Sequence, residues 1–130
     1  MALNLTEGQL KRQVEDYLDY AQNQGKLLWL RLNAGDFIEV RGNTRRRVKG
    51  CPAGTSDLII IKARKYFKHM PQIIIPDVLF VELKSAKGKR RPEQGAFQKL
   101  VEMQGGEYVI VRSFEELQAI LNKGERDALY

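Results

Sequence analysis

The chain has 130 residues, of which 22 are Lys or Arg and 16 are Asp or Glu, giving a formal net charge of +6. This length predicts one domain, residues 1–130, and the basic charge favours a polyanionic partner such as nucleic acid. Cys51 is the only cysteine, which excludes an internal disulfide or a zinc site built from several cysteines. No stretch has the length of a membrane span, so we expect a cytoplasmic protein with no membrane partner.

The first predicted element is an amphipathic helix over residues 6–24. Thr6 and Gln9 have the spacing of a capping box, and apolar residues follow at helical intervals. Residues 26–33 are then predicted to form the first strand, with Trp29 in the core.

Residues 36–50 are predicted to be irregular, apart from a short strand over 37–40 that turns at Gly42. A run of basic residues lies in this segment. Such a run is often a solvated face, but its place directly before the candidate site favours contact with phosphates. We therefore expect DNA contacts from Arg45, Arg46, Arg47 and Lys49.

Two continuous apolar runs, residues 58–61 and 78–81, predict two strands that are buried on both faces. The connector over 62–76 is basic and contains aromatic residues, including Tyr66 and Phe67. Aromatic and basic side chains together can bind single-stranded nucleic acid, although an anchored loop explains them equally well.

A second basic cluster follows the second apolar run and consists of Lys87, Lys89, Arg90 and Arg91. Pro92 then predicts a helix that ends at Gly105. A final strand is expected over 107–112 and a last helix after Ser113, with a loose tail beyond Gly124. The folded core should therefore cover about residues 6–123.

Acidic residues lie at the ends of the two apolar runs. Asp57 directly precedes the first run, and Glu82 directly follows the second. If the runs pair as antiparallel strands, the start of the first lies beside the end of the second, which places Asp57 next to Glu82. Two carboxylates at one point suit Mg²⁺, with water completing its shell. Lys84 lies two residues after Glu82 on the same face, where it could position a water or stabilise charge on a phosphate.

Asp77 is the competing acidic residue, because Pro76-Asp77 also precedes Glu82. Asp77 and Glu82 are five residues apart on one strand, which separates them by roughly 16 Å and places them on opposite faces. They cannot share a cation, so Asp57 is the predicted ligand.

The order of these motifs resembles the virus-type replication-repair nuclease (VRR-NUC) family of the PD-(D/E)XK nuclease superfamily. The resemblance runs from about Glu7 to Leu121. The motifs that carry it are Gly54-x-Ser56-Asp57, Glu82-Leu83-Lys84, Pro92-Glu93-Gln94, and Gly105-Gly106 before the final strand.

The resemblance implies a restriction-endonuclease-like α/β fold, a mixed β-sheet flanked by helices with an αβββαβ core. It implies metal-dependent hydrolysis of phosphodiester bonds with Mg²⁺ or Mn²⁺ as cofactor. Asp57 and Glu82 would then bind the metal with the Leu83 carbonyl and an early helix carboxylate, either Glu7 or Glu15. The catalytic residues would be Asp57, Glu82, Lys84 and a helix glutamine, either Gln94 or Gln98.

Relatives with this single-domain form resemble homodimeric nucleases that cut branched DNA, including Holliday junctions. We therefore expect a homodimer that acts on branched DNA. Two alternatives remain open from the sequence: a nuclease for flaps or nonspecific DNA, and a basic DNA-binding module without activity.

Overall fold

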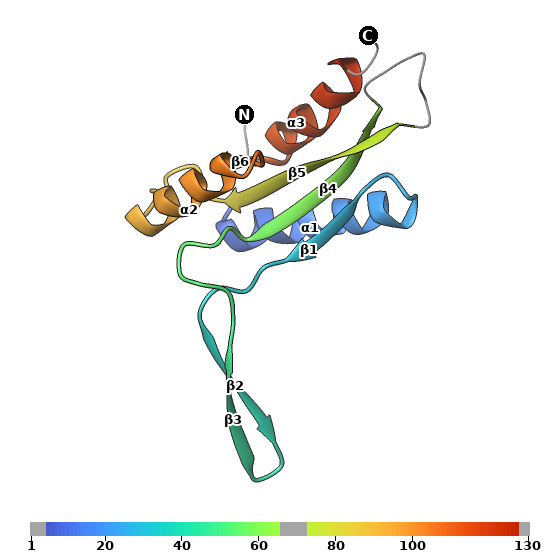
Figure 1. The fold of residues 1–130 in the computed structure, drawn as a ribbon. Helices are drawn as coiled ribbons and strands as arrows, with labels where there is room; N and C mark the ends of the chain where they lie inside the picture. The colour runs from blue at the N-terminus through green and yellow to red at the C-terminus, as the bar shows by residue number, and fades with distance from the viewer. Residues whose placement is uncertain (1–4, 66–72, 128–130) are drawn as a thin grey trace.

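We analysed a computed structural model that describes residues 5–65 and 73–127. Three helices and six strands are defined there (Figure 1). In chain order they are α1 (Glu7–Asn23), β1 (Leu28–Arg31), β2 (Asp36–Arg41), β3 (Thr44–Lys49), β4 (Leu58–Lys65), β5 (Ile74–Leu83), α2 (Pro92–Met103), β6 (Glu107–Val111) and α3 (Phe114–Asp127).

The central sheet has four strands in the order β1-β4-β5-β6. β4 is antiparallel to both β1 and β5, whereas β6 is parallel to β5. A parallel neighbour needs a long crossover, and α2 provides it between β5 and β6. The predicted mixed sheet with flanking helices is confirmed at this level.

One face of the sheet carries the hydrophobic core. Leu58 and Ile60 of β4 lie opposite Val81 and Leu79 of β5, and all four are buried. α1 and α3 cover this face together, since Leu10, Val14, Leu18, Leu117 and Leu121 belong to the same core cluster. Strand pairing and helix packing therefore bury the same side chains.

The N-terminal cap of α1 forms as its sequence predicts. The Thr6 hydroxyl accepts the N–H of Gln9 at 3.1 Å, and the Gln9 side chain accepts the N–H of Thr6 at 2.9 Å. These two bonds satisfy backbone donors that the first turn would otherwise leave free. The helix begins at Glu7, so the capped first turn holds the backbone that carries the Glu7 carboxylate.

The segment over 36–50 is more regular than predicted. Its residues form a complete two-stranded hairpin, β2 and β3, with the turn between Arg41 and Thr44. Gly42 in that turn has a φ of 57°, which suits glycine. Figure 1 shows the hairpin projecting away from the four-stranded sheet. Both of its faces are largely exposed, so it lacks the burial alternation by which strands are predicted.

The two central strands are also longer than their apolar runs. β4 continues to Lys65 and β5 starts at Ile74, so much of the predicted connector is strand. Arg64 and Asp77 form an ion pair across this extension, at 2.6 Å. Tyr66 and Phe67 lie outside the described residues. At the C-terminal end, α3 continues to Asp127, beyond the predicted start of a loose tail at Gly124.

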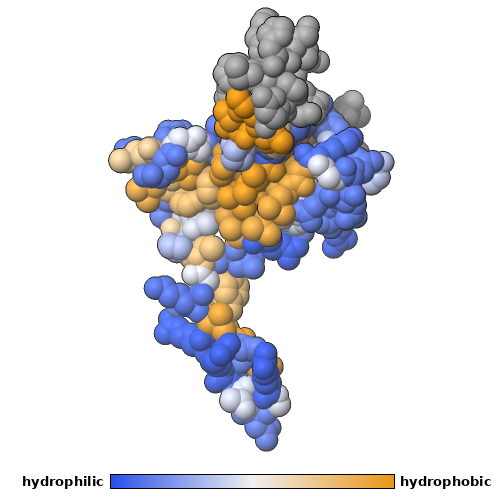
Figure 2. All heavy atoms as spheres, turned by 45° about the vertical axis from the view of Figure 1, so that its right-hand side comes forward, coloured by the Kyte–Doolittle hydropathy of each residue, from blue (hydrophilic) through white to orange (hydrophobic). Residues whose placement is uncertain are grey.

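The second face of the sheet is only partly covered. α2 packs over β5 and β6, where Phe97 stacks edge-on against Phe80 and Tyr108 at centroid distances of 5.4 and 6.1 Å. No described helix packs over β1 and β4 on this side, and Figure 2 shows a continuous hydrophobic surface on the body of the molecule. We call this surface the open face and define it by register as Leu28, Leu30, Ile59, Ile61, Ala63, Ile74, Pro76 and Val78.

Within 5–65 and 73–127, no helix is both long and apolar enough to cross a membrane.

Candidate active site

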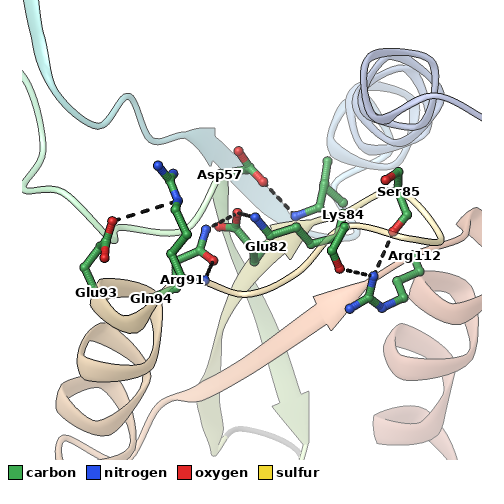
Figure 3. Close-up of polar contacts among 10 residues, drawn as sticks. Asp57, Glu82, Lys84, Ser85, Arg91, Glu93, Gln94 and Arg112 are labelled. Carbon is green, nitrogen blue, oxygen red and sulfur yellow. Dashed lines mark hydrogen bonds and ion pairs between the residues drawn. The ribbon is translucent and has the colours of Figure 1, made fainter.

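The β4–β5 pairing brings together the two predicted acidic residues. Leu58 pairs with Val81, so the preceding residue of β4, Asp57, lies beside Glu82 at the end of β5. Asp57 Oδ2 accepts the backbone N–H of Leu83 at 2.7 Å. The predicted juxtaposition is confirmed, and the carboxylate of Asp57 is held against the strand that carries Glu82 (Figure 3).

The turn before Asp57 is positioned by close contact with α2. Gly54 is buried, has a φ of 91°, and a Cβ there would lie 2.3 Å from the Glu93 carbonyl oxygen. Only glycine fits such an approach in this conformation. Ser56 next to it is fully buried and donates to the Leu58 carbonyl at 3.3 Å. The Gly-x-Ser-Asp motif therefore packs the start of β4 against the first turn of α2.

Glu82 near the end of β5 and Lys84 directly after the strand contact each other. Lys84 Nζ is 3.6 Å from Glu82 Oε1, and the two residues are 8% and 4% exposed. Exposed ion pairs contribute little, but a buried carboxylate needs a partner to remain charged. This pair is therefore part of the site's interior.

Gln94 is the helix glutamine that reaches the site. Its Nε2 donates to Glu82 Oε1 at 2.8 Å, and its Oε1 accepts the N–H of Arg91 at 2.9 Å. Because a backbone donor occupies the amide oxygen, the amide nitrogen must face Glu82. The alternative, Gln98, instead bonds Glu102 one turn further along α2. Gln94 thus orients Glu82.

Of the two helix carboxylates, Glu15 is engaged elsewhere, in an ion pair with Arg31. Glu7 is exposed in the first turn of α1, and its charge contributes to raising the pKa of Glu82. Glu7 therefore belongs to the same end of the molecule as the site. Asp77 pairs with Lys62 in register and binds Arg64, at the other end of β5, as expected of a residue outside the site.

Burial is the main cause that raises the pKa of Glu82, from 4.5 to about 7. The negative charge of Asp57 raises it further, while Lys84 lowers it and Glu7 adds a smaller upward effect. Two neighbouring carboxylates thus repel each other in a poorly solvated place. A divalent cation between them would relieve this repulsion.

The oxygen atoms at this site suit a hydrated divalent cation. Within the described part of the chain, no three His, Cys, Asp or Glu side chains cluster closely enough to hold a metal by themselves. Mg²⁺ is commonly bound by one or two carboxylates with several waters, so Asp57 and Glu82, with the Leu83 carbonyl next to them in the chain, could hold a hydrated ion. The residues present fit a hydrated hard cation better than a dehydrated one.

The second basic cluster adjoins the site, since Lys84 precedes it and Gln94 follows it. All four of its members are exposed: Lys87, Lys89, Arg90 and Arg91. Arg112 of the last described loop shapes this segment by donating to the carbonyls of Ser85 and Gly88 at 2.8 and 2.7 Å. No sequence pattern predicts this role of Arg112, because its partners are backbone carbonyls.

The first basic cluster lies on β3 in the projecting hairpin. Arg46 pairs with Glu39 at 3.0 Å, and Arg47 pairs with Asp36. Arg45 and Lys49 have no ion pair within the described residues. The arginine side chains of these two pairs are highly exposed, and exposed ion pairs contribute little free energy. A DNA phosphate could therefore replace the carboxylates as their partner.

Tyr108 also lies near the site, although the sequence pattern did not predict it there. It is 8% exposed, lies on the same sheet face as Glu82, and its hydroxyl has no hydrogen-bond partner within the described residues. The sequence places it only as an apolar member of the final strand.

Comparisons with protein-family models, with curated proteins and with solved structures give no significant match to this chain.

The raised pKa of Glu82 predicts a specific pH dependence of stability. The folded state holds this proton more tightly than the unfolded state, so the contribution is present below about pH 4.5 and is lost as the pH rises to about 7. In EDTA, the free energy of unfolding should fall over this range by up to about 3 kcal/mol more in the wild type than in Glu82→Gln.

Urea denaturation at several pH values measures this difference. Asp57→Asn is the matched control, because removing that charge should move the loss of stability to lower pH. Parallel pH profiles for the wild type and Glu82→Gln would contradict the assignment.

Proposed function

We propose that this protein is a metal-dependent endonuclease that hydrolyses phosphodiester bonds in branched DNA, with a fold of the restriction-endonuclease-like kind. The observation that carries the proposal is the meeting of Asp57, Glu82 and Lys84 at the ends of two paired strands. A surface ion pair or a turn aspartate explains each residue singly. Neither explains why the three are gathered, why Glu82 and Lys84 are buried, and why Gln94 donates to Glu82.

Each residue of the site would have a separate role in phosphodiester hydrolysis. A bound Mg²⁺ or Mn²⁺ would polarise the phosphate and lower the pKa of a bound water. Asp57, fixed by the Leu83 N–H, and Glu82, oriented by Gln94, would hold that cation from two sides. Lys84 would place its ammonium beside the attacking water or the phosphate. The Leu83 carbonyl is the third proposed metal ligand. Glu7 does not cluster with Asp57 and Glu82 in the described residues, so it would act on the cation through one of its bound waters.

The two basic clusters support DNA as the substrate. The cluster over 87–91 adjoins the site and suits the phosphates next to the scissile bond. The hairpin cluster lies on an arm that projects from the sheet, so it suits a more distant part of the same DNA (Figure 1). A branched molecule offers duplex in more than one direction, which matches two separated basic surfaces.

The open face supports a homodimer. Three of its members, Leu28, Leu30 and Ile74, are 46%, 54% and 58% exposed. All of its members are apolar, and Lys65, the register partner of Ile74, lies at its edge. A twofold interface brings the same patch of both copies together, so the exposed aliphatic side chains of the open face would be buried against those of the partner. A dimer would also give the two catalytic centres that paired cuts in a symmetric junction require.

The catalytic assignment predicts that Asp57→Ala and Glu82→Ala each abolish cleavage while DNA binding in EDTA is retained. Lys84→Ala should lower the cleavage rate roughly hundredfold without preventing metal binding, because its interaction is with the reacting groups. Cleavage of a four-way junction, a flap and a linear duplex is compared with Mg²⁺ and with Mn²⁺.

Asp77→Ala serves as the control in these assays and should cleave like the wild type. Preference for flaps or equal cleavage of linear duplex would reassign the substrate. Tight binding without cleavage in either metal would favour a DNA-binding module and contradict the proposal.

The dimer predicts that Leu30→Glu gives a folded monomer, since it places a charge in the open face. Sedimentation velocity at micromolar concentration measures the mass, and circular dichroism checks the fold. Tyr20→Glu is the control, because Tyr20 is 63% exposed on α1 and outside the open face. A wild type that stays monomeric, or a Leu30→Glu variant that stays dimeric, would refute this interface.

The basic clusters predict different effects. Each phosphate contact that is lost should reduce the slope of log affinity against log salt by about 0.9. Alanine at Arg45, Arg46, Arg47 and Lys49 should therefore reduce this slope but leave the cleavage rate at saturating DNA nearly unchanged. Alanine at Lys87, Lys89, Arg90 and Arg91 should reduce both. Unchanged slopes in both variants would mean that the positive charge does not contact DNA.

A further inference from the structure

The Tyr108 hydroxyl is a buried donor with no acceptor. It is the one buried side-chain oxygen or nitrogen without a hydrogen-bond partner in the described residues. Buried polar groups are nearly always paired, so an exception calls for a reason. A phenylalanine would fill the same place without this defect.

The ring of Tyr108 is held firmly beside the proposed metal site. Tyr108 pairs with Phe80 in the parallel β5–β6 ladder, so it shares a sheet face with Glu82. Phe97 packs edge-on against the ring, and the Arg90 guanidinium lies over it at 5.7 Å from the centroid. The ring of Tyr108 is therefore held by its neighbours, whereas its hydroxyl has no hydrogen-bond partner within the described residues.

Glu82 has an oxygen that could accept this donor. Gln94 and Lys84 both contact Oε1, and Oε2 has no hydrogen-bond partner within the described residues. A hydroxyl is a suitable donor here because it orients a carboxylate without adding a positive charge that would repel a cation. Burial and then the charge of Glu82 raise the pKa of Tyr108, so it keeps its proton over the usual pH range.

We propose that Tyr108 is a positioning residue whose hydroxyl donates a hydrogen bond to the Glu82 carboxylate when a divalent cation binds between Asp57 and Glu82. This inference rests on the proposed metal site. The hydroxyl has no partner among the described residues, and a Glu82 carboxylate oriented for a cation would supply one. Gln94 and Tyr108 would then fix the two oxygens of Glu82 separately.

Tyr108→Phe tests the proposal because it removes only the hydroxyl and keeps the ring contacts. In EDTA its melting temperature should equal or exceed that of the wild type, since a buried unpaired group is lost. Calorimetry should show Mn²⁺ binding weakened roughly tenfold or more, the effect of losing one hydrogen bond to a charged group. Cleavage should recover toward the wild-type rate when Mn²⁺ is saturating.

Tyr17→Phe is the matched control, because Tyr17 packs against Phe114 in the helical layer on the other face of the sheet, and it should change none of these readouts. Wild-type Mn²⁺ affinity in Tyr108→Phe would overturn the inference while leaving the metal site intact. A Tyr108→Phe variant that melts lower in EDTA would also overturn it, since the hydroxyl would then have a structural partner. Absence of Mn²⁺ binding by the wild type would refute the metal site itself and the inference with it.

Discussion

The antiparallel pairing of β4 with β5 is the constraint on which the site depends. Its register places Asp57 beside Glu82, and the apolar partners Leu58 and Val81 fix that register because both are buried in the core. A slip of one residue would turn the buried side chains outward and move Asp57 away from Glu82. The energy that sets the geometry of the site therefore comes from hydrophobic burial next to it.

The burial that fixes the site geometry also makes it costly to keep the Glu82 carboxylate charged. Glu82 is nearly inaccessible and adjoins the charge of Asp57, so its pKa rises to about 7. Lys84 and Gln94 offset part of this cost by contacting the same oxygen. Perturbed carboxylates in contact with a buried lysine are characteristic of functional sites, where stability is given up for reactivity. A bound cation would remove the remaining repulsion.

The sequence predicted the central part of this arrangement and missed its periphery. Asp57, Glu82 and Lys84 could be placed because continuous apolar runs fix where buried strands end. The family resemblance left Gln94 and Gln98 as alternatives, and only the side-chain contacts distinguish them. The hairpin strand β3 was missed because both of its faces are exposed, so no periodicity marks it. Arg112 binds backbone carbonyls, and the Tyr108 hydroxyl matters only through its surroundings. The open face depends on which side each helix covers, which the order of elements does not specify.

The most direct test of the central claim is anomalous diffraction from crystals soaked in Mn²⁺. The account predicts one strong anomalous peak between the carboxylates of Asp57 and Glu82, within coordination distance of both, and its loss in Glu82→Gln. A Mn²⁺ peak at Asp77, or none near Asp57 in a crystal where the site is open to solvent, would contradict it.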